Sequence, residues 1–433
     1  MQKNKRLLIF CWALSGWALG VDAAPQPWAD QQCQWRLPIV VSAQLGTLDQ
    51  RPVVMRWSRV AQALHGTRVR LSSLRLIAGD ELVPYQIDHR NAAGQLVPSG
   101  NLRLDPEDEL VFVCPSDRET VLHLYGSEEP RPLVRFPSGL QVTSLRDGSG
   151  QAHYVLSTAD LKIGIQGAGA VDPTVNIRRN HGRGSVVELT WHGQSAIWPS
   201  MNWAVYMNGH PFAMERWRSA KLMLDGPVRK VIAVQGIGEV VKKGDGTTDC
   251  HVNVTRYFSM FAGVPLYEVE DRLQCVQVPS DWTVTYSDRF FAGSAQDASD
   301  VLWDGSTGVL REIRLADRGF QNTASNGLVE TQDASAGWYA WYDIQEKKGL
   351  AVFYRSTSLA AERTSFQSGW ELYSSVNRMS FAYRNLHSPI TLWHRFRVMG
   401  VANADGKQIA TEYGLWADDT GLPVAIGPLE RRR

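Results

Sequence analysis

The fold class is decided by the stretch Val69-Arg-Leu-Ser-Ser-Leu-Arg-Leu-Ile-Ala-Gly-Asp-Glu-Leu-Val-Pro-Tyr-Gln-Ile-Asp88. The runs 74–77 and 82–88 are strand-like, with apolar and polar residues alternating over 74–76 and 85–88, and the Gly-Asp pair between the runs is a turn signal. A period of two indicates β-strands, because successive side chains of a strand point to opposite faces of a sheet. The stretch therefore predicts short antiparallel strands.

The same pattern continues on both sides of this stretch. Shorter strand-like runs fill the chain up to Tyr125, with one short helix predicted over 59–64, and longer runs follow from 186 to 398. No 12-residue stretch of the second half shows helical periodicity. Glu128-Glu-Pro-Arg-Pro132 interrupts the pattern and marks a boundary. We predict an all-β protein: a small N-terminal β-barrel or sandwich, then a large two-sheet β-sandwich.

The N-terminus predicts export. Basic residues at 3, 5 and 6 precede an apolar run over 7–19, and Val21-Asp-Ala23 fits a signal peptidase site. We predict a signal peptide over 1–23, a linker over 24–35, the small domain over 36–127, the large domain over 128–400, and a C-terminal strand or tail over 401–433. No later segment is apolar and long enough to span a membrane. We therefore expect a periplasmic or secreted protein.

Charge and cysteine content limit which partners, disulfides and metal sites we expect. With 45 basic and 44 acidic residues, the net charge of +1 provides no field to attract nucleic acid. Four of the five cysteines follow the leader, which in an oxidising compartment allows disulfides. Cys250 and Cys275 lie on neighbouring strand-like runs and are the pair that we predict; Cys33 with Cys114 is the other pairing considered. The spacings do not match a zinc site, and we predict no metal and no cofactor.

Tryptophan is abundant, with 16 in the chain and Trp12 and Trp17 in the leader. Its flat apolar ring with one N–H donor is suited to stacking on sugar rings. The alternative is that large sheet-on-sheet cores simply use aromatic residues.

The first half resembles a known family. The stretch 69–88, followed by Asp108-Glu-Leu-Val-Phe112 and Leu122-His-Leu-Tyr125, is similar to the N-terminal barrel domain of bacterial exo-acting rhamnogalacturonan lyase-like proteins. The second half, on Arg256-Tyr-Phe-Ser-Met-Phe-Ala-Gly-Val-Pro-Leu-Tyr267, resembles the large sandwich that those proteins share with sugar mutarotases and several polysaccharide lyases. The chain departs from that pattern in lacking a helical toroid domain. The resemblance implies a carbohydrate substrate and a polysaccharide lyase activity.

Lyase chemistry needs a base, an acid and groups that stabilise charge on a uronate carboxylate. Two segments, 176–184 with two glycines and 198–210 with a proline and a glycine, and the run 286–289 carry such residues. The catalytic candidates are His181, His210, Tyr286 and Arg289. The binding candidates are Arg179, Arg183, Trp198, Asn202, Tyr206, Trp338, Trp393 and Arg395. Surface charge and ordinary turn or core histidines are the alternatives.

Strand alternation refines the last two candidates. It places Trp393, Arg395 and Arg397 on one face, opposite His394 and Phe396, so the first three can form a platform for an anionic sugar. His394 beside Phe396 is predicted to be a core histidine. Glu270 and Asp271 are adjacent acids on opposite faces, for which salt bridges are the expected role.

We therefore predict an exported polysaccharide lyase acting on a uronate-containing polysaccharide or oligosaccharide. The alternatives are a non-catalytic glycan-binding or accessory protein, and a glycoside hydrolase or mutarotase-like enzyme on the same fold. The sequence contains no Gly-Ser nucleophile elbow, no His-Glu-x-x-His, no phosphate loop and no dinucleotide fingerprint.

Overall fold

The structure is a computed structural model of the chain. It describes residues 28–43, 46–98, 103–146, 152–166, 186–191, 194–197, 202–207, 210–212, 216–241, 248–279, 284–291, 300–305, 310–314, 336–356, 363–371, 376–383, 388–417 and 424–432. The predicted signal peptide lies outside the described residues.

The small domain consists of two packed sheets. The outer sheet has the order β27-β1-β7-β3-β4, with β28 also paired to β1, and the inner sheet has the order β2-β6-β5. The outer strands are β1 (Trp35–Val41), β3 (Arg75–Ala78), β4 (Glu81–Leu82), β7 (Thr120–Gly126), β27 (Val424–Ile426) and β28 (Glu430–Arg431). The inner strands are β2 (Gln50–Arg56), β5 (Tyr85–Asp88) and β6 (Glu109–Pro115). Helix α1 (Trp57–Ala63) confirms the short helix predicted here, and a 3-10 turn spans Leu71–Ser73.

The inner sheet is buried on both faces. On β6, Leu110 and Phe112 pack into the core between the two small-domain sheets, whereas Val111 joins a second core against the large domain. Because side chains of a strand alternate between its faces, Glu109 shares the face of Val111. The inner sheet therefore connects the two halves of the molecule.

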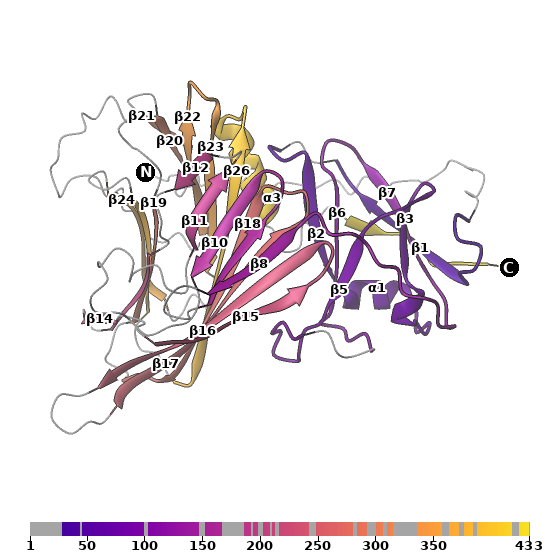
Figure 1. Ribbon diagram of the computed structural model, residues 1–433, viewed down its shortest axis with the longest axis horizontal. Coiled ribbons are helices and arrows are strands. Elements are labelled where there is room, and N and C mark those ends of the chain that lie inside the picture. The colour runs from indigo at the N-terminus through magenta and orange to yellow at the C-terminus, as the bar shows by residue number, and fades with distance from the viewer. Residues whose placement is uncertain are drawn as a thin grey trace, which may run out of the picture.

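The large domain is built around a central sheet of nine strands, all antiparallel to their neighbours, in the order β15-β16-β17-β18-β26-β23-β22-β20-β21. The strands are β15 (Arg216–Asp225), β16 (Arg229–Val241), β17 (Thr248–Phe261), β18 (Leu266–Gln277), β20 (Asp300–Asp304), β21 (Arg311–Arg314), β22 (Ala336–Asp343), β23 (Lys348–Ser356) and β26 (Ile390–Ala402). In Figure 1 this sheet lies between the small domain and the strands β14, β19 and β24.

Two five-stranded sheets accompany the central sheet. The first lateral sheet contains β8 (Gln141–Arg146), β9 (Ala152–Ser157), β10 (Leu161–Gln166), β11 (Val186–Trp191) and β12 (Gln194–Ile197). The second contains β13 (Asn202–Met207), β14 (His210–Phe212), β19 (Val284–Phe291), β24 (Arg363–Glu371) and β25 (Val376–Tyr383). One apolar core joins Ile163 and Leu189 of the first lateral sheet, Val269 and Phe396 of the central sheet, and Tyr383 of the second.

The all-β prediction is confirmed, with a sandwich in each half. Among the described strands the small domain is two sheets, and none of the sheets closes into a barrel. The predicted second layer of the large sandwich is divided into two separate sheets.

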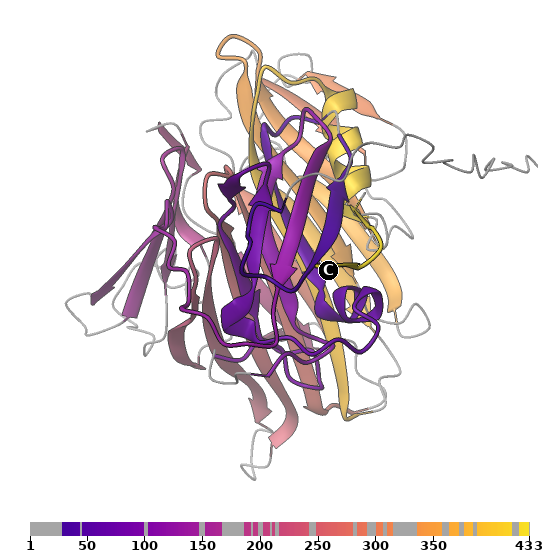
Figure 2. The same ribbon diagram turned by 90° about the vertical axis from the view of Figure 1, so that its right-hand side faces the viewer.

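One prediction about helices is wrong. Residues Gly406–Ala417 form the helix α3, which packs beside β22 and β23 (Figure 2). Ile409, Tyr413 and Trp416 are spaced at i, i+4 and i+7, which turns one stripe of the helix to the core. Asp405 caps the helix, because its Oδ1 accepts from the Gln408 N–H (2.8 Å) while Gln408 Oε1 accepts from the Asp405 N–H (2.9 Å).

The predicted disulfide is also wrong. Cys250 and Cys275 are fully buried on neighbouring strands, but both are thiols. In the register of β17 and β18, Cys275 lies opposite Val252 and Gln277 lies opposite His251, so Cys250 and Cys275 are at least two positions out of register, with a bulge between them. Diagonal neighbours are about 7–8 Å apart, beyond the usual reach of a disulfide. Cys33 and Cys114 are buried thiols as well.

Among the described residues, no helix combines the length and the apolar character that crossing a membrane requires.

Candidate functional site

Strand β18 presents polar side chains on both faces of the central sheet. Glu268 and Glu270 point to the small domain, and Asp271 points into the core between the central and lateral sheets. The predicted separation of Glu270 and Asp271 onto opposite faces is confirmed, and both form ion pairs. The two faces carry different clusters. The buried row consists of Arg256, Asp271, His394 and Tyr383. The interdomain cluster consists of Asp88, Arg90, Glu109, Arg229, Glu268, Glu270, Arg272, Trp393 and Arg397.

The buried row begins with an ion pair between Arg256 of β17 and Asp271 of β18. The two residues are directly opposite in register, and both side chains are fully buried. Arg256 Nε donates to Asp271 Oδ1 and Nη2 donates to Oδ2, each at 2.7 Å. Such a bidentate pair fixes both side chains and compensates the two charges within an apolar core.

His394 of β26 continues the buried row. It lies directly opposite Asp271 in register and is fully buried, which confirms the predicted core histidine. Its Nε2 is 2.7 Å from the hydroxyl of Tyr383, which comes from β25 of the second lateral sheet. Burial, with a contribution from the positive charge of Arg256, lowers the pKa of His394 to about 3. The imidazole is therefore neutral at ordinary pH, and it forms a hydrogen bond with the phenol.

The sequence carries a signal for this row, which the predicted site residues missed. Arg256, Asp271 and His394 each occupy a core-facing strand position whose neighbours at ±2 are apolar. A polar residue in such a position costs free energy unless it finds partners, so it marks a buried polar cluster. No comparable signal marks Tyr383 in the sequence, because its contact with His394 depends on how a second sheet packs against the central sheet.

The predicted sugar platform has the expected strand geometry, but two of its side chains bind other residues of the protein. Trp393, Arg395 and Arg397 share one face of β26, opposite the buried His394 and Phe396, as predicted. That face belongs to the interdomain cluster.

Two contacts occupy the platform. The Arg272 guanidinium lies 3.4 Å from the centre of the Trp393 ring, and Arg397 Nη2 is 2.6 Å from Glu268 Oε1. Arg272 Nη2 also donates to the carbonyl of Gly94 in the small domain, at 2.7 Å. One face of Trp393 is thus stacked by an arginine that binds the other domain.

Trp338 is not a surface residue. Its side chain is buried at 3 % exposure in the core that faces the small domain and α3. The next residue, Tyr339, is buried in the core on the opposite face of β22. The prediction that Trp338 binds sugar is therefore not supported, because the side chains of Trp338 and Tyr339 are covered on opposite faces of the strand.

The remaining candidates fall partly outside the described residues. His181, Arg179, Arg183 and Trp198 lie in segments that the structure does not describe. For Asn202, Tyr206, His210, Tyr286 and Arg289 the backbone alone is described. All five are on the second lateral sheet, where Asn202 pairs with Arg289, Val205 with Tyr286 and Met207 with His210. Tyr383 lies on the same sheet, so the fold brings these segments to the sheet that completes the buried row.

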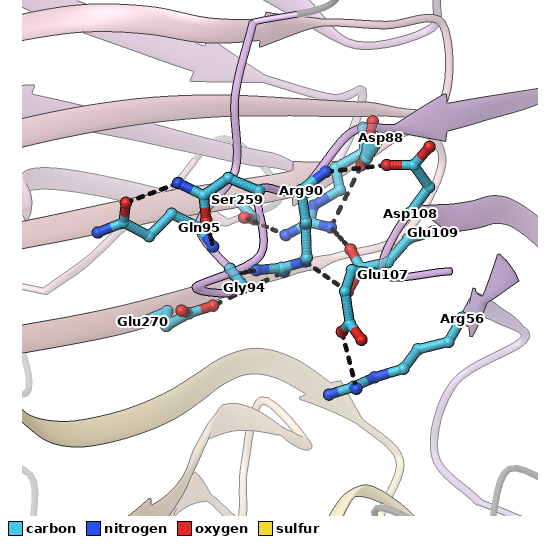
Figure 3. Close-up of polar contacts among 12 residues, drawn as sticks. Arg56, Asp88, Arg90, Gly94, Gln95, Glu107, Asp108, Glu109, Ser259 and Glu270 are labelled. Atoms are coloured by element: carbon cyan, nitrogen blue, oxygen red, sulfur yellow. Dashed lines mark hydrogen bonds and ion pairs between the residues drawn. The ribbon is translucent and has the colours of Figure 1, made fainter. Parts of the chain in front are cut away.

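The interdomain cluster explains the two motifs that carried the family resemblance (Figure 3). In the first, Gln86 and Asp88 bind the start of β16 in the large domain. In the second, Asp108 binds its own domain, since its Oδ2 is 3.0 Å from His89 Nδ1 and its Oδ1 accepts from the Arg90 N–H. Glu109 binds Arg90 (2.8 Å) and, across the interface, Arg229 (3.1 Å).

No group of three or more histidine, cysteine, aspartate or glutamate residues within the described ranges could hold a metal ion. The arrangement offers a phenol hydrogen-bonded to a neutral imidazole on one face of the central sheet, and ion pairing between domains on the other.

No family model matches the chain, and no curated protein matches it. Among solved structures it is similar to an alpha-mannosidase from Enterococcus faecalis V583, with 8% identity, a TM-score of 0.48, and 92% of this chain and 46% of that chain covered. It is also similar to a galactose mutarotase-like protein from Clostridium acetobutylicum, with 8% identity, a TM-score of 0.38, and 61% and 99% covered. The chain spans less than half the length of the mannosidase. At these values the similarities assign no activity to this chain.

Proposed function

We propose that the protein is an exported carbohydrate-active enzyme that cleaves a uronate-containing polysaccharide by β-elimination. The contact between the Tyr383 hydroxyl and His394 Nε2, at 2.7 Å, is the observation that carries this proposal. A phenol held in place by a neutral imidazole can act as the group that takes the α proton and returns it to the leaving oxygen. The export signal and the tryptophan content support an extracellular or periplasmic glycan as the substrate.

The reaction assigns a role to each group. The Tyr383 phenol first releases its proton to solvent, and the phenolate oxygen, held by a hydrogen bond to neutral His394, takes the proton α to the uronate carboxylate. The electron pair that is released forms the carbon–carbon double bond as the bond to the glycosidic oxygen breaks. That oxygen then receives the same proton from Tyr383, which returns to the phenolate, while neutral His394 keeps the Tyr383 oxygen in position. Asp271, held by Arg256, keeps the polar row in place beside the imidazole.

The experiment is an incubation of the full chain with pectins, alginate, ulvan and glycosaminoglycans, followed by the ultraviolet absorbance of unsaturated uronates. Tyr383→Phe removes the hydroxyl, and we expect it to lower the rate by about 10²–10⁴-fold. Tyr354→Phe is the matched control, because Tyr354 is also fully buried in the same core. Absence of the chromophore across the panel, or equal rates for Tyr383→Phe and the wild type, would contradict the proposal.

A second function, non-catalytic glycan binding, is favoured by one observation. Tyr383 and His394 are both fully buried and bind each other, as expected for a structural pair. Glycan-array binding by the wild type, retained in Tyr383→Phe and without any product, identifies a binding protein. New reducing ends without the chromophore, or anomer exchange without cleavage, would instead identify a hydrolase or a mutarotase-like enzyme.

A further inference from the structure

Two carboxylates of the small domain converge on one nitrogen atom of the large domain. Arg229 Nη1 is 3.3 Å from Asp88 Oδ2 and 3.1 Å from Glu109 Oε2. Asp88 and Glu109 are directly opposite in the register of β5 and β6, and their side chains are 2 % and 11 % exposed. Two carboxylates this close in a buried site repel one another unless one of them is protonated.

The two carboxylates are not equally compensated. Glu109 has its own cation, because Arg90 Nε lies 2.8 Å from its Oε1. The other oxygen of Asp88 accepts from the neutral amide of Gln86, at 2.5 Å. Figure 3 shows Asp88 and Glu109 near one another beside Arg90, with Glu270 on the other side of Arg90. Asp88 is therefore the member of the pair that takes a proton first.

The surrounding charges agree with this assignment. Arg229 Nη2 donates to Ser259 on β17 (3.2 Å), Arg90 Nη2 approaches Glu270 on β18 (3.8 Å), and the positive charge of Arg395 on β26 acts on Glu109. Burial raises the pKa of Asp88 to about 6, against the pull of Arg229, and the charge of Glu109 adds to the rise. The cations Arg90 and Arg229 outweigh burial at Glu109 and hold its pKa below the usual value.

We propose that the interface between the small domain and the central sheet is a proton-linked latch, in which Asp88 binds a proton as the domains dock against one another. Docking therefore tightens as the pH falls and loosens as it rises. The sign follows from linkage, because the docked state holds the proton that a solvated Asp88 would release. The stabilisation is complete below the solvated value of 3.8 and is lost as the pH rises through about 6. Glu109 acts oppositely, since its ion pairs are lost as the pH falls below its lowered pKa.

Hydrogen exchange of the full chain tests the latch at the Val228 and Arg229 amides, which donate to Gln86 Oε1 across the interface. After correction for intrinsic rates, we expect their protection to fall by up to about 30-fold from pH 4.5 to pH 7.5, because the pKa difference of roughly two units is only partly titrated over this range. Asp88→Asn should abolish this dependence and raise the protection at pH 7.5. Asp80→Asn, at an exposed turn of the same domain, should leave it unchanged.

An unchanged pH dependence in Asp88→Asn would overturn the proposal. If that variant does not fold, infrared spectra of the wild type provide a second test. A protonated carboxyl band that disappears as the pH rises through 6 is expected, and its absence from the folded protein at pH 5 would equally overturn the latch.

Discussion

The side-chain amide of Gln86 binds the backbone of Arg229 from another domain as a neighbouring strand would. Its Oε1 accepts from the Arg229 N–H at 2.7 Å, and its Nε2 donates to the Arg229 carbonyl at 3.2 Å. The same oxygen accepts from the Val228 N–H at 3.0 Å. One glutamine therefore satisfies three backbone groups at the start of β16.

Gln86→Ala should destabilise the protein by about 1–3 kcal/mol, because buried backbone groups at Val228 and Arg229 lose their partners. Urea unfolding at pH 7 measures the effect, and hydrogen exchange should show it at those two amides. Gln95→Ala, at an exposed loop position of the same domain, is the control. A free energy of unfolding equal to that of the wild type would show that the contact is not needed for docking.

Gly226→Ala should have a similar effect by a different route. A Cβ atom at position 226 would overlap the side-chain amide of Gln86, so the glutamine must leave its site. We expect a loss of about 1–3 kcal/mol that is not additive with Gln86→Ala in a double-mutant cycle. Gly139→Ala, where an added Cβ would meet nothing, is the matched control. Additive losses would mean that the two residues act separately.

Removing one member of the buried ion pair should lower the free energy of unfolding more than replacing both members by apolar residues. Arg256→Met or Asp271→Leu alone should each lose about 3–5 kcal/mol, because the partner charge is left buried without compensation. The double variant should recover much of this loss while remaining inactive if the row is catalytic. Denaturant unfolding measures the cycle. A double variant less stable than both single ones would contradict the expectation.

His394 should make the protein less stable in acid. Its folded pKa of about 3 lies below the ordinary value of 6.5, so the unfolded chain binds a proton that the folded chain excludes. Stability should fall as the pH drops from 6.5 towards 3, with a slope approaching about 1.4 kcal/mol per pH unit. His394→Gln should reduce this slope in pH-dependent thermal unfolding. The effect is opposite in sign to that of Asp88, so the two variants separate the contributions.

Local pattern was enough to predict the strands and the direction of their side chains. Alternation placed Trp393 and His394 on opposite faces of β26, and it separated Glu270 from Asp271. It could not show what covers each face. Trp338 is buried because β22 has a core on both sides, and Trp393 is stacked by an arginine that lies far from it in the sequence.

The clusters themselves depend on contacts far apart in the chain. Asp88 and Arg229 are 141 positions apart, and Arg256, Asp271, His394 and Tyr383 come from four strands of two sheets. The helix α3 was predictable, since Asp405 and Gln408 are a capping pair ahead of an i, i+4, i+7 apolar stripe. The strength of the β pattern in the preceding 200 or so residues obscured it.

The strands β27 and β28 have a consequence for the order of folding. They pair with β1, and the ion pair between Arg36 and Glu430 joins residues 394 positions apart. During synthesis the edge of β1 stays open until residues 424–431 have been made, so the small domain cannot be completed as an early folding unit. Such non-local closure slows folding and leaves an unpaired edge exposed in the nascent chain. For a chain predicted to cross a membrane before it folds, late completion delays a structure that would obstruct its passage.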